Sequence, residues 1–138
     1  ARALLCGMSR GTNKAHIARA ALESIAFQVS DVLTAMQSDI AHPLKELRVD
    51  GGASQNDMLM QFQADILNVP VLRPKMLEST AWGAAAMAGL KSGIFSNMSE
   101  ISESLQLDRA FEPNMNIEQR QFHLDQWKTA LKRSKSEI

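Results

Sequence analysis

A strand, a tight turn and the start of a helix are expected at Arg48-Val49-Asp50-Gly51-Gly52-Ala53-Ser54-Gln55-Asn56. Apolar and charged residues alternate from Leu44 to Asp50, as they do in a half-buried strand. Apolar residues then recur at helical spacing from Met58 to Leu67, and Asn68 suits the left-handed geometry that often follows a helix. The stretch therefore predicts a strand–turn–helix unit, the element from which α/β sheets are built.

Upstream of this unit, the sequence predicts another strand and a long helix. The apolar run Ala3-Leu4-Leu5-Cys6, closed by Gly7, is typical of a buried strand. A wide apolar stripe with intervals of three and four residues follows, so we expect a helix that touches the core on more than one side. Thr12 or Asn13 supplies its N-cap, and His42-Pro43 ends it, because proline disfavours helical geometry in the preceding residue.

Downstream of the unit, a third strand and a helix of small residues are expected. The strand covers Val69–Leu72, and Pro70 restricts it to a sheet edge or to a strand start. The helix runs from Ser79 to Leu90, and Gly93 stops it. Its Gly83 and Gly89 indicate a packing demand, because glycine is less favourable than alanine in a helix by about 1 kcal/mol.

The pattern weakens beyond this helix. A short helix through Leu105, capped by Asn97 or Ser99, a turn at residues 111–114 and a last helix from Ile117 to Leu131 are expected. The alternation of strands and helices predicts an α/β layer structure with parallel strands. Three strands make a thin sheet, which suggests that partner strands lie outside this chain.

Composition excludes several classes of protein. The chain has 138 residues, enough for one domain, with 45% apolar and 22% charged residues. Fifteen basic and fifteen acidic residues balance, so the basic excess of nucleic-acid modules is missing. No apolar stretch approaches the roughly 20 residues that span a bilayer, and no secretory leader is evident. A single cysteine rules out an internal disulfide and a cysteine-rich zinc site, and we expect a cytoplasmic protein.

The turn at residues 50–56 also has features of a ligand site. Ligands bind at the carboxyl ends of strands in open α/β sheets, and a helix N-terminus offers N–H groups and partial positive charge to a phosphate. However, no lysine follows the glycines as in a P-loop, and the third glycine of the dinucleotide fingerprint is missing. Two interpretations stay open, a nucleotide site and a simple turn with Asp50 or Ser54 as the helix cap.

The remaining reactive side chains indicate neither a nucleophile nor a metal centre. Cys6 lies in the expected first strand, where a buried and inert thiol is the expected state. His16, His42 and His123 have no cysteine, aspartate or second histidine at ligand spacing, so no metal-ligating residue is predicted.

Four segments together resemble the C-terminal part of glycerol kinases, which are FGGY carbohydrate kinases of the actin, hexokinase and Hsp70 fold superfamily. They are Arg48–Leu67, Gly7–Asn13 with His16–Ala26, Thr80–Ala85 with Ala88–Leu90, and Phe111–Pro113 with Trp127–Lys128. The resemblance implies part of an actin-like (ribonuclease H-like) ATPase domain, with three layers and a small, mostly parallel sheet flanked by helices. It also implies a partial nucleotide-binding domain at residues 1–112 and a helical tail packed on it at residues 113–138.

The resemblance assigns ATP binding to the turn. It implies that Gly52 backs onto the phosphates, that Asn56 contacts the adenosine portion, and that Gly51 and Ala53 line the same turn. On this basis Asn56→Ala is expected to weaken nucleotide binding modestly and to leave the fold intact.

The resemblance further implies that the whole protein uses ATP and Mg²⁺ to phosphorylate glycerol, giving glycerol 3-phosphate. The catalytic aspartate, the glycerol-binding residues and a phosphate loop would lie upstream, so we expect no catalytic residue here and no activity from this chain alone. The family often forms homo-oligomers, and neither nucleic acid nor membrane is an expected partner. Two alternatives remain, another FGGY kinase acting on a pentulose-type sugar and a non-enzymatic actin-like nucleotide-binding or interaction module.

Overall fold

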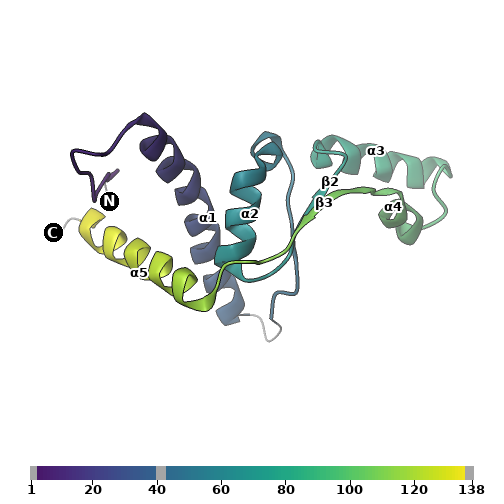
Figure 1. The fold of residues 1–138 in the computed structure, drawn as a ribbon. Helices are drawn as coiled ribbons and strands as arrows, with labels where there is room; N and C mark the ends of the chain where they lie inside the picture. Colours follow the sequence, from purple (N-terminus) through teal and green to yellow (C-terminus); the bar gives the residue numbers. More distant parts are fainter. Residues whose placement is uncertain (1–2, 40–42, 136–138) are drawn as a thin grey trace.

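The chain forms an α/β structure in which helices lie on both sides of a small sheet (Figure 1). This computed structural model describes residues 3–39 and 43–135. The elements in chain order are α1 (Lys14–Asp39), β1 (Leu47–Arg48), the 3-10 helix η1 (Gly52–Gln55), α2 (Asp57–Leu67), β2 (Val71–Pro74), α3 (Ser79–Ser92), α4 (Met98–Ser104), β3 (Leu107–Phe111) and α5 (Ile117–Ser134). Helices α1, α2 and α5 lie on one side of β2 and β3, and α3 and α4 lie on the other. The predicted α/β class, with a small sheet flanked by helices, is confirmed.

The sheet has the strand order β1-β2-β3 and mixes two kinds of pairing. β1 and β2 are parallel, as the strand–helix alternation predicts, with Leu47 opposite Val71. β2 and β3 are antiparallel, with Val71 opposite Phe111, so only one of the two pairings fits a mostly parallel sheet. The sequence pattern does not predict β3, because charged residues occupy two of its five positions. Phe111 accordingly ends a strand and is buried in the core, and the expected turn begins only after it.

The third predicted strand is displaced by two residues. β2 covers Val71–Pro74 and is the central strand of the sheet. Pro70 immediately precedes it, where the missing N–H costs no ladder bond and its carbonyl accepts from the Leu47 backbone N–H at 2.8 Å. Of the two positions that proline allows, the strand start is therefore the one realised.

The predicted first strand is wrong for this chain. No strand forms between residues 3 and 13, and Leu4 and Leu5 are 44% and 63% exposed. Cys6 is also exposed, which corrects the expectation of a buried thiol. The physical reason is that a strand needs a ladder partner, and no described strand pairs with this segment.

The long helix forms as predicted, but its apolar stripe is only partly covered. Asn13 is the N-cap, because its Oδ1 accepts from the backbone N–H groups of Ala15 at 3.0 Å and His16 at 3.2 Å. The predicted end of this helix at His42-Pro43 involves His42, which lies outside the described ranges. Only Ala26 and Phe27 are buried in α1. Four other apolar side chains of the stripe are 38–58% exposed, namely Ile17, Ile25, Val32 and Met36. The expectation of core contact on several sides thus fails for the chain by itself.

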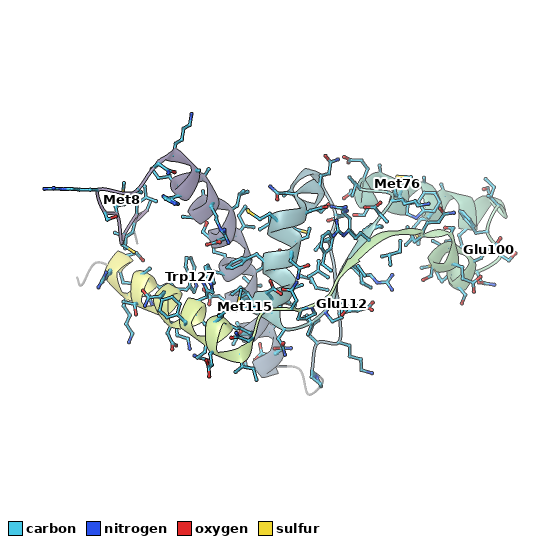
Figure 2. All side chains as sticks on the ribbon, viewed as in Figure 1. Met8, Met76, Glu100, Glu112, Met115 and Trp127 are labelled. Carbon is cyan, nitrogen blue, oxygen red and sulfur yellow. The ribbon has the colours of Figure 1, made fainter. Side chains whose placement is uncertain are left out.

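An aromatic cluster joins α1, α2 and α5. Phe27 lies edge-on to Phe62 with ring centroids 5.4 Å apart and stacks on Trp127 at 5.1 Å. Trp127 lies between α5 and α1 (Figure 2), and its indole N–H donates to the Asp31 carboxylate at 2.8 Å. This cluster places the last helix against the long one.

The start of the C-terminal segment is held by a buried carboxylate of α2. Oδ1 of Asp65 accepts from the backbone N–H groups of Asn114 at 2.8 Å and Met115 at 3.2 Å. Arg120 then donates from Nε to the Ile66 carbonyl at 2.7 Å. Because Asp65 is only 7% exposed, the two N–H bonds satisfy its buried oxygen, and together with the Arg120 bond they fix where the chain leaves the sheet.

The small residues of α3 have two different explanations. A Cβ on Gly89 would lie 2.9 Å from the ring of Phe95, so the predicted packing demand is confirmed there. A Cβ on Gly83 would meet nothing within 4 Å, so no packing within the described chain requires that glycine. The helix ends at Gly93 as predicted, with a left-handed φ of +80°, and Asn97 caps α4 by accepting from the Glu100 N–H at 3.0 Å.

Candidate functional site

The backbone of the turn after β1 requires glycine at its first position. Gly51 has φ +77° and ψ 175°, a conformation that is essentially confined to glycine. Its N–H donates to the Leu77 carbonyl at 2.9 Å, and its own carbonyl accepts from the Ser54 hydroxyl at 2.7 Å. Ser54 is 1% exposed, so the turn is closed from inside by a buried hydroxyl.

Gly52 and Ala53 occupy the exposed side of the same turn. Gly52 begins η1 with no left-handed φ, and a Cβ built on it would meet nothing within 4 Å. The fold of this chain therefore does not need glycine at position 52. Open space over an exposed turn is the arrangement in which an approaching ligand benefits from the missing Cβ.

Asn56 is the N-cap of α2. Its Oδ1 accepts from the Leu59 backbone N–H at 3.0 Å, so the cap predicted at Asp50 or Ser54 is provided by Asn56 instead. The physical reason is that η1 inserts one turn between the glycines and the helix, which moves the helix start to Asp57. Asn56 is half-buried, and its amide N–H groups make no hydrogen bond within the part of the chain that the structure describes.

A cluster of ion pairs between β2, β3 and α2 supports the turn. Arg73 of β2 donates from Nη1 to Asp57 Oδ1 at 2.7 Å and to the Ser54 carbonyl at 2.9 Å. From Nε it donates to Asp108 Oδ2 at 2.7 Å. Arg109 binds the second oxygen of Asp57, and both guanidinium groups lie over the Phe111 ring, at 5.2 and 4.6 Å from its centroid.

This cluster changes the pKa of two of its members, Asp57 and Arg73. The hydrogen bond from Arg73 lowers the pKa of the Asp57 carboxyl below its ordinary value, and the charge of Arg109 lowers it further. Asp57 and Asp108 in turn raise the pKa of the Arg73 guanidinium. Asp57 and Arg73 are therefore both charged at neutral pH.

Sequence reasoning singled out neither Arg73 nor Asp57. A signal was nevertheless present, because Arg73 follows Val71 by two positions and therefore points to the same face of the strand. Val71 is fully buried. An arginine on the buried face of a central strand must be paired, and the partners are polar groups of neighbouring elements.

A large cavity lies on the other face of the sheet. It has a volume of about 630 Å³, lies between the strands and helices α3 and α4, and is mostly apolar, with Val49, Leu72, Trp82 and Met87 in its wall. Asp50 reaches it, but none of the predicted site residues at positions 51, 52, 53 and 56 does. Because most of this wall is apolar and the predicted site residues lie outside it, we place the candidate site at the turn rather than in the cavity.

Within residues 3–39 and 43–135, no group of three or more histidine, cysteine or acidic side chains is arranged to hold a metal ion. Over the same ranges, no helix is both long and apolar enough to cross a bilayer.

Comparisons with known proteins agree on one family. The model of the C-terminal domain of the FGGY family of carbohydrate kinases matches residues 1–92. A glycerol kinase of Acinetobacter baylyi is 78% identical over 138 residues, which are all of this chain and 28% of that protein. A glycerol kinase of Janthinobacterium sp. is 54% identical over 99% of this chain and 27% of its own length. The chain thus spans little more than a quarter of these relatives.

Solved structures show the same fold. The crystal structure of Plasmodium falciparum glycerol kinase with ADP matches with a TM-score of 0.88 and 36% identity, over 100% of this chain and 28% of that one. Gluconate kinase from Lactobacillus acidophilus matches with a TM-score of 0.74 and 26% identity, over 96% of this chain and 26% of that one. The expected actin-like fold is thereby confirmed. With residues 1–92 matched by its C-terminal domain model, the chain belongs to the FGGY family of carbohydrate kinases.

Proposed function

We propose that this chain is the ATP-binding part of a glycerol kinase, which transfers the γ-phosphoryl group of ATP to glycerol and gives glycerol 3-phosphate. The observation that carries the proposal is the turn at Gly51–Asn56, which leaves open space over Gly52 in a chain 78% identical to a glycerol kinase. The likeness to a glycerol kinase crystallised with ADP supports the nucleotide.

Each residue of the turn has a distinct role in this proposal. The missing Cβ of Gly52 lets the phosphates approach the backbone, and the exposed Ala53 lines the same surface. Gly51 holds the turn in its unusual conformation. Asn56 offers to the adenosine portion the amide N–H groups that bond no residue in the described ranges, while its oxygen caps α2. When bound, ATP supplies the phosphoryl group, and these residues orient it.

Other parts of the proposal concern the whole protein. We assign the catalytic base, the glycerol pocket and most of the Mg²⁺ contacts to polypeptide outside this chain, so no catalytic or metal-binding residue is assigned here. Residues 1–112 would form part of the nucleotide-binding domain and residues 113–138 its helical tail. A homo-oligomeric, cytoplasmic enzyme with glycerol and ATP as its ligands completes the proposal.

The substrate can be tested on the full-length protein. We expect ATP-dependent phosphorylation of glycerol, and much weaker turnover of xylulose and gluconate, measured by coupling ADP release to NADH oxidation. Xylulose and gluconate are matched controls because a xylulose kinase and a gluconate kinase share the fold. A preference for either sugar over glycerol would contradict the proposal and favour a different FGGY kinase.

Asn56 should affect nucleotide binding and stability separately. Asn56→Ser keeps a capping oxygen but loses the amide donors, so ATP affinity should fall by up to about tenfold while the melting temperature stays near that of the wild type. Asn56→Ala should show the same loss of affinity together with a lower melting temperature, because uncapping α2 costs about 0.5–2 kcal/mol. The cap at Leu59 thus adds a loss of stability to the weaker binding expected from the sequence for Asn56→Ala.

ATP titration and thermal melting of both full-length variants separate these effects. If Asn56→Ser binds ATP as tightly as the wild type, Asn56 is only a helix cap.

A further inference from the structure

Arg73 makes three hydrogen bonds that connect three parts of the chain. Its guanidinium joins η1 through the Ser54 carbonyl, α2 through Asp57, and β3 through Asp108. Its side chain is only 12% exposed, and the ring of Phe111 covers one face of it. The group is thus held in one orientation by neighbours on several elements.

The geometry of these bonds requires arginine. Nε points to one carboxylate while Nη1 points to a second carboxylate and a carbonyl, which uses the fixed fork of a planar guanidinium. A lysine at position 73 would present a single ammonium and could not hold acceptors in these separate directions.

Hydrogen bonds to β2 and to the segment after β2 hold the turn that carries the proposed nucleotide site. On one side Gly51 donates its N–H to Leu77, and on the other Arg73 donates to Ser54, whose hydroxyl closes the turn onto the Gly51 carbonyl. Within the described residues, the turn makes no other side-chain or long-range hydrogen bond except at the start of α2. Loss of the Arg73 bond therefore frees the middle of the turn.

We propose that Arg73 is a positioning residue for ATP, which acts by holding the turn at residues 51–56 in its binding geometry. The inference rests on the proposed function, because it assumes that this turn holds the nucleotide. Arg73 acts through the Ser54 carbonyl rather than by touching the ligand.

The test compares two lysine variants of the full-length enzyme. Arg73→Lys should raise KM for ATP about fivefold to tenfold and leave kcat and KM for glycerol within about twofold. Arg109→Lys is the matched control, because Arg109 binds the same Asp57 carboxylate and lies over the same ring but makes no bond to Ser54. It should leave all three constants within about twofold.

A second measurement reads the turn itself, without reference to activity. Hydrogen–deuterium exchange of peptides covering residues 51–56 should be faster in Arg73→Lys than in the wild type and in Arg109→Lys, because the freed turn opens more often. If Arg73→Lys does not fold, Asp108→Asn removes the charge that orients Nε and is measured in the same way, with a smaller increase expected.

The outcomes separate this inference from the proposed function. Unchanged exchange and an unchanged KM for ATP in Arg73→Lys overturn the inference, and so does an equal rise of both KM values. Faster exchange in Arg73→Lys with no change in KM for ATP also overturns the inference. If Gly52→Val also leaves KM for ATP unchanged, the nucleotide site itself lies elsewhere. Faster exchange together with a selective rise in KM for ATP supports both.

Discussion

Purified by itself, the 138-residue chain should show no turnover of glycerol with Mg²⁺ and ATP, in contrast to the roughly 1–100 s⁻¹ typical of kinases. Phosphoryl transfer depends on positioning both reactants and stabilising charge on the transferred group. The proposed nucleotide site in this chain is a single exposed turn, and the described residues hold no cluster of acidic or histidine side chains suited to a metal. A coupled assay at saturating glycerol and ATP measures the turnover.

Two controls make this result interpretable. A cooperative thermal transition shows that the chain is folded during the assay, and its aromatic cluster around Trp127 supplies a fluorescence signal for it. Any trace activity is then compared with that of the same chain carrying Gly52→Val, since a contaminating kinase would not respond to the substitution. Turnover near that of ordinary kinases, lost in the variant, would contradict the assignment of the catalytic parts to polypeptide outside this chain.

Features with local physical causes could be predicted from the sequence. Asn68 adopts the predicted left-handed conformation with φ 56° and ψ 38°, and Gly93 ends α3 in the same region. Asn97 caps α4, and a strand, a turn and a helix follow one another around Gly51. In each case a few neighbouring residues determine the backbone geometry, because capping and turn preferences act within one helical turn.

Features that depend on distant partners could not be predicted in this way. Residues 3–6 have the composition of a buried strand, but burial needs a partner, and Leu5 is 63% exposed in this chain. The sheet instead contains β3. Asp108 and Arg109 interrupt its apolar–polar alternation, because both side chains form ion pairs in the cluster around Arg73. The stripe of α1 is likewise uncovered in the described chain, which spans only 28% of the length of one relative.

The positions of the candidate site could be predicted from the sequence, but the separate role of each residue could not. Adjacent glycines look equivalent in sequence, and only the backbone angles show that Gly51 is required by the fold while Gly52 is not. Likewise, the amide of Asn56 suits a ligand and a helix N-cap equally, and the structure shows that its oxygen already serves the helix. The two glycines therefore give the sharpest test of where the nucleotide lies.

Gly52→Val in the full-length enzyme should raise KM for ATP by about tenfold or more, with KM for glycerol within about twofold. The expected cause is steric, since the branched side chain would fill the open space over the turn that the phosphates need. Stability should not fall, because nothing within 4 Å meets a Cβ at this position and valine is no worse than glycine in a helical conformation. Initial-rate kinetics with each substrate varied in turn provide both constants.

Gly51→Ala is the matched control, one residue away. Its backbone has φ +77° and ψ 175°, so a Cβ introduces strain of about 1–3 kcal/mol, and the melting temperature should drop clearly. Thermal melting therefore distinguishes a glycine that the fold needs from one that the ligand needs. If Gly52→Val instead raises both KM values equally while its melting temperature is unchanged, the phosphates do not lie over this turn. If Gly52→Val lowers the melting temperature as much as Gly51→Ala does, position 52 is structural and the open space over it belongs to another part of the polypeptide.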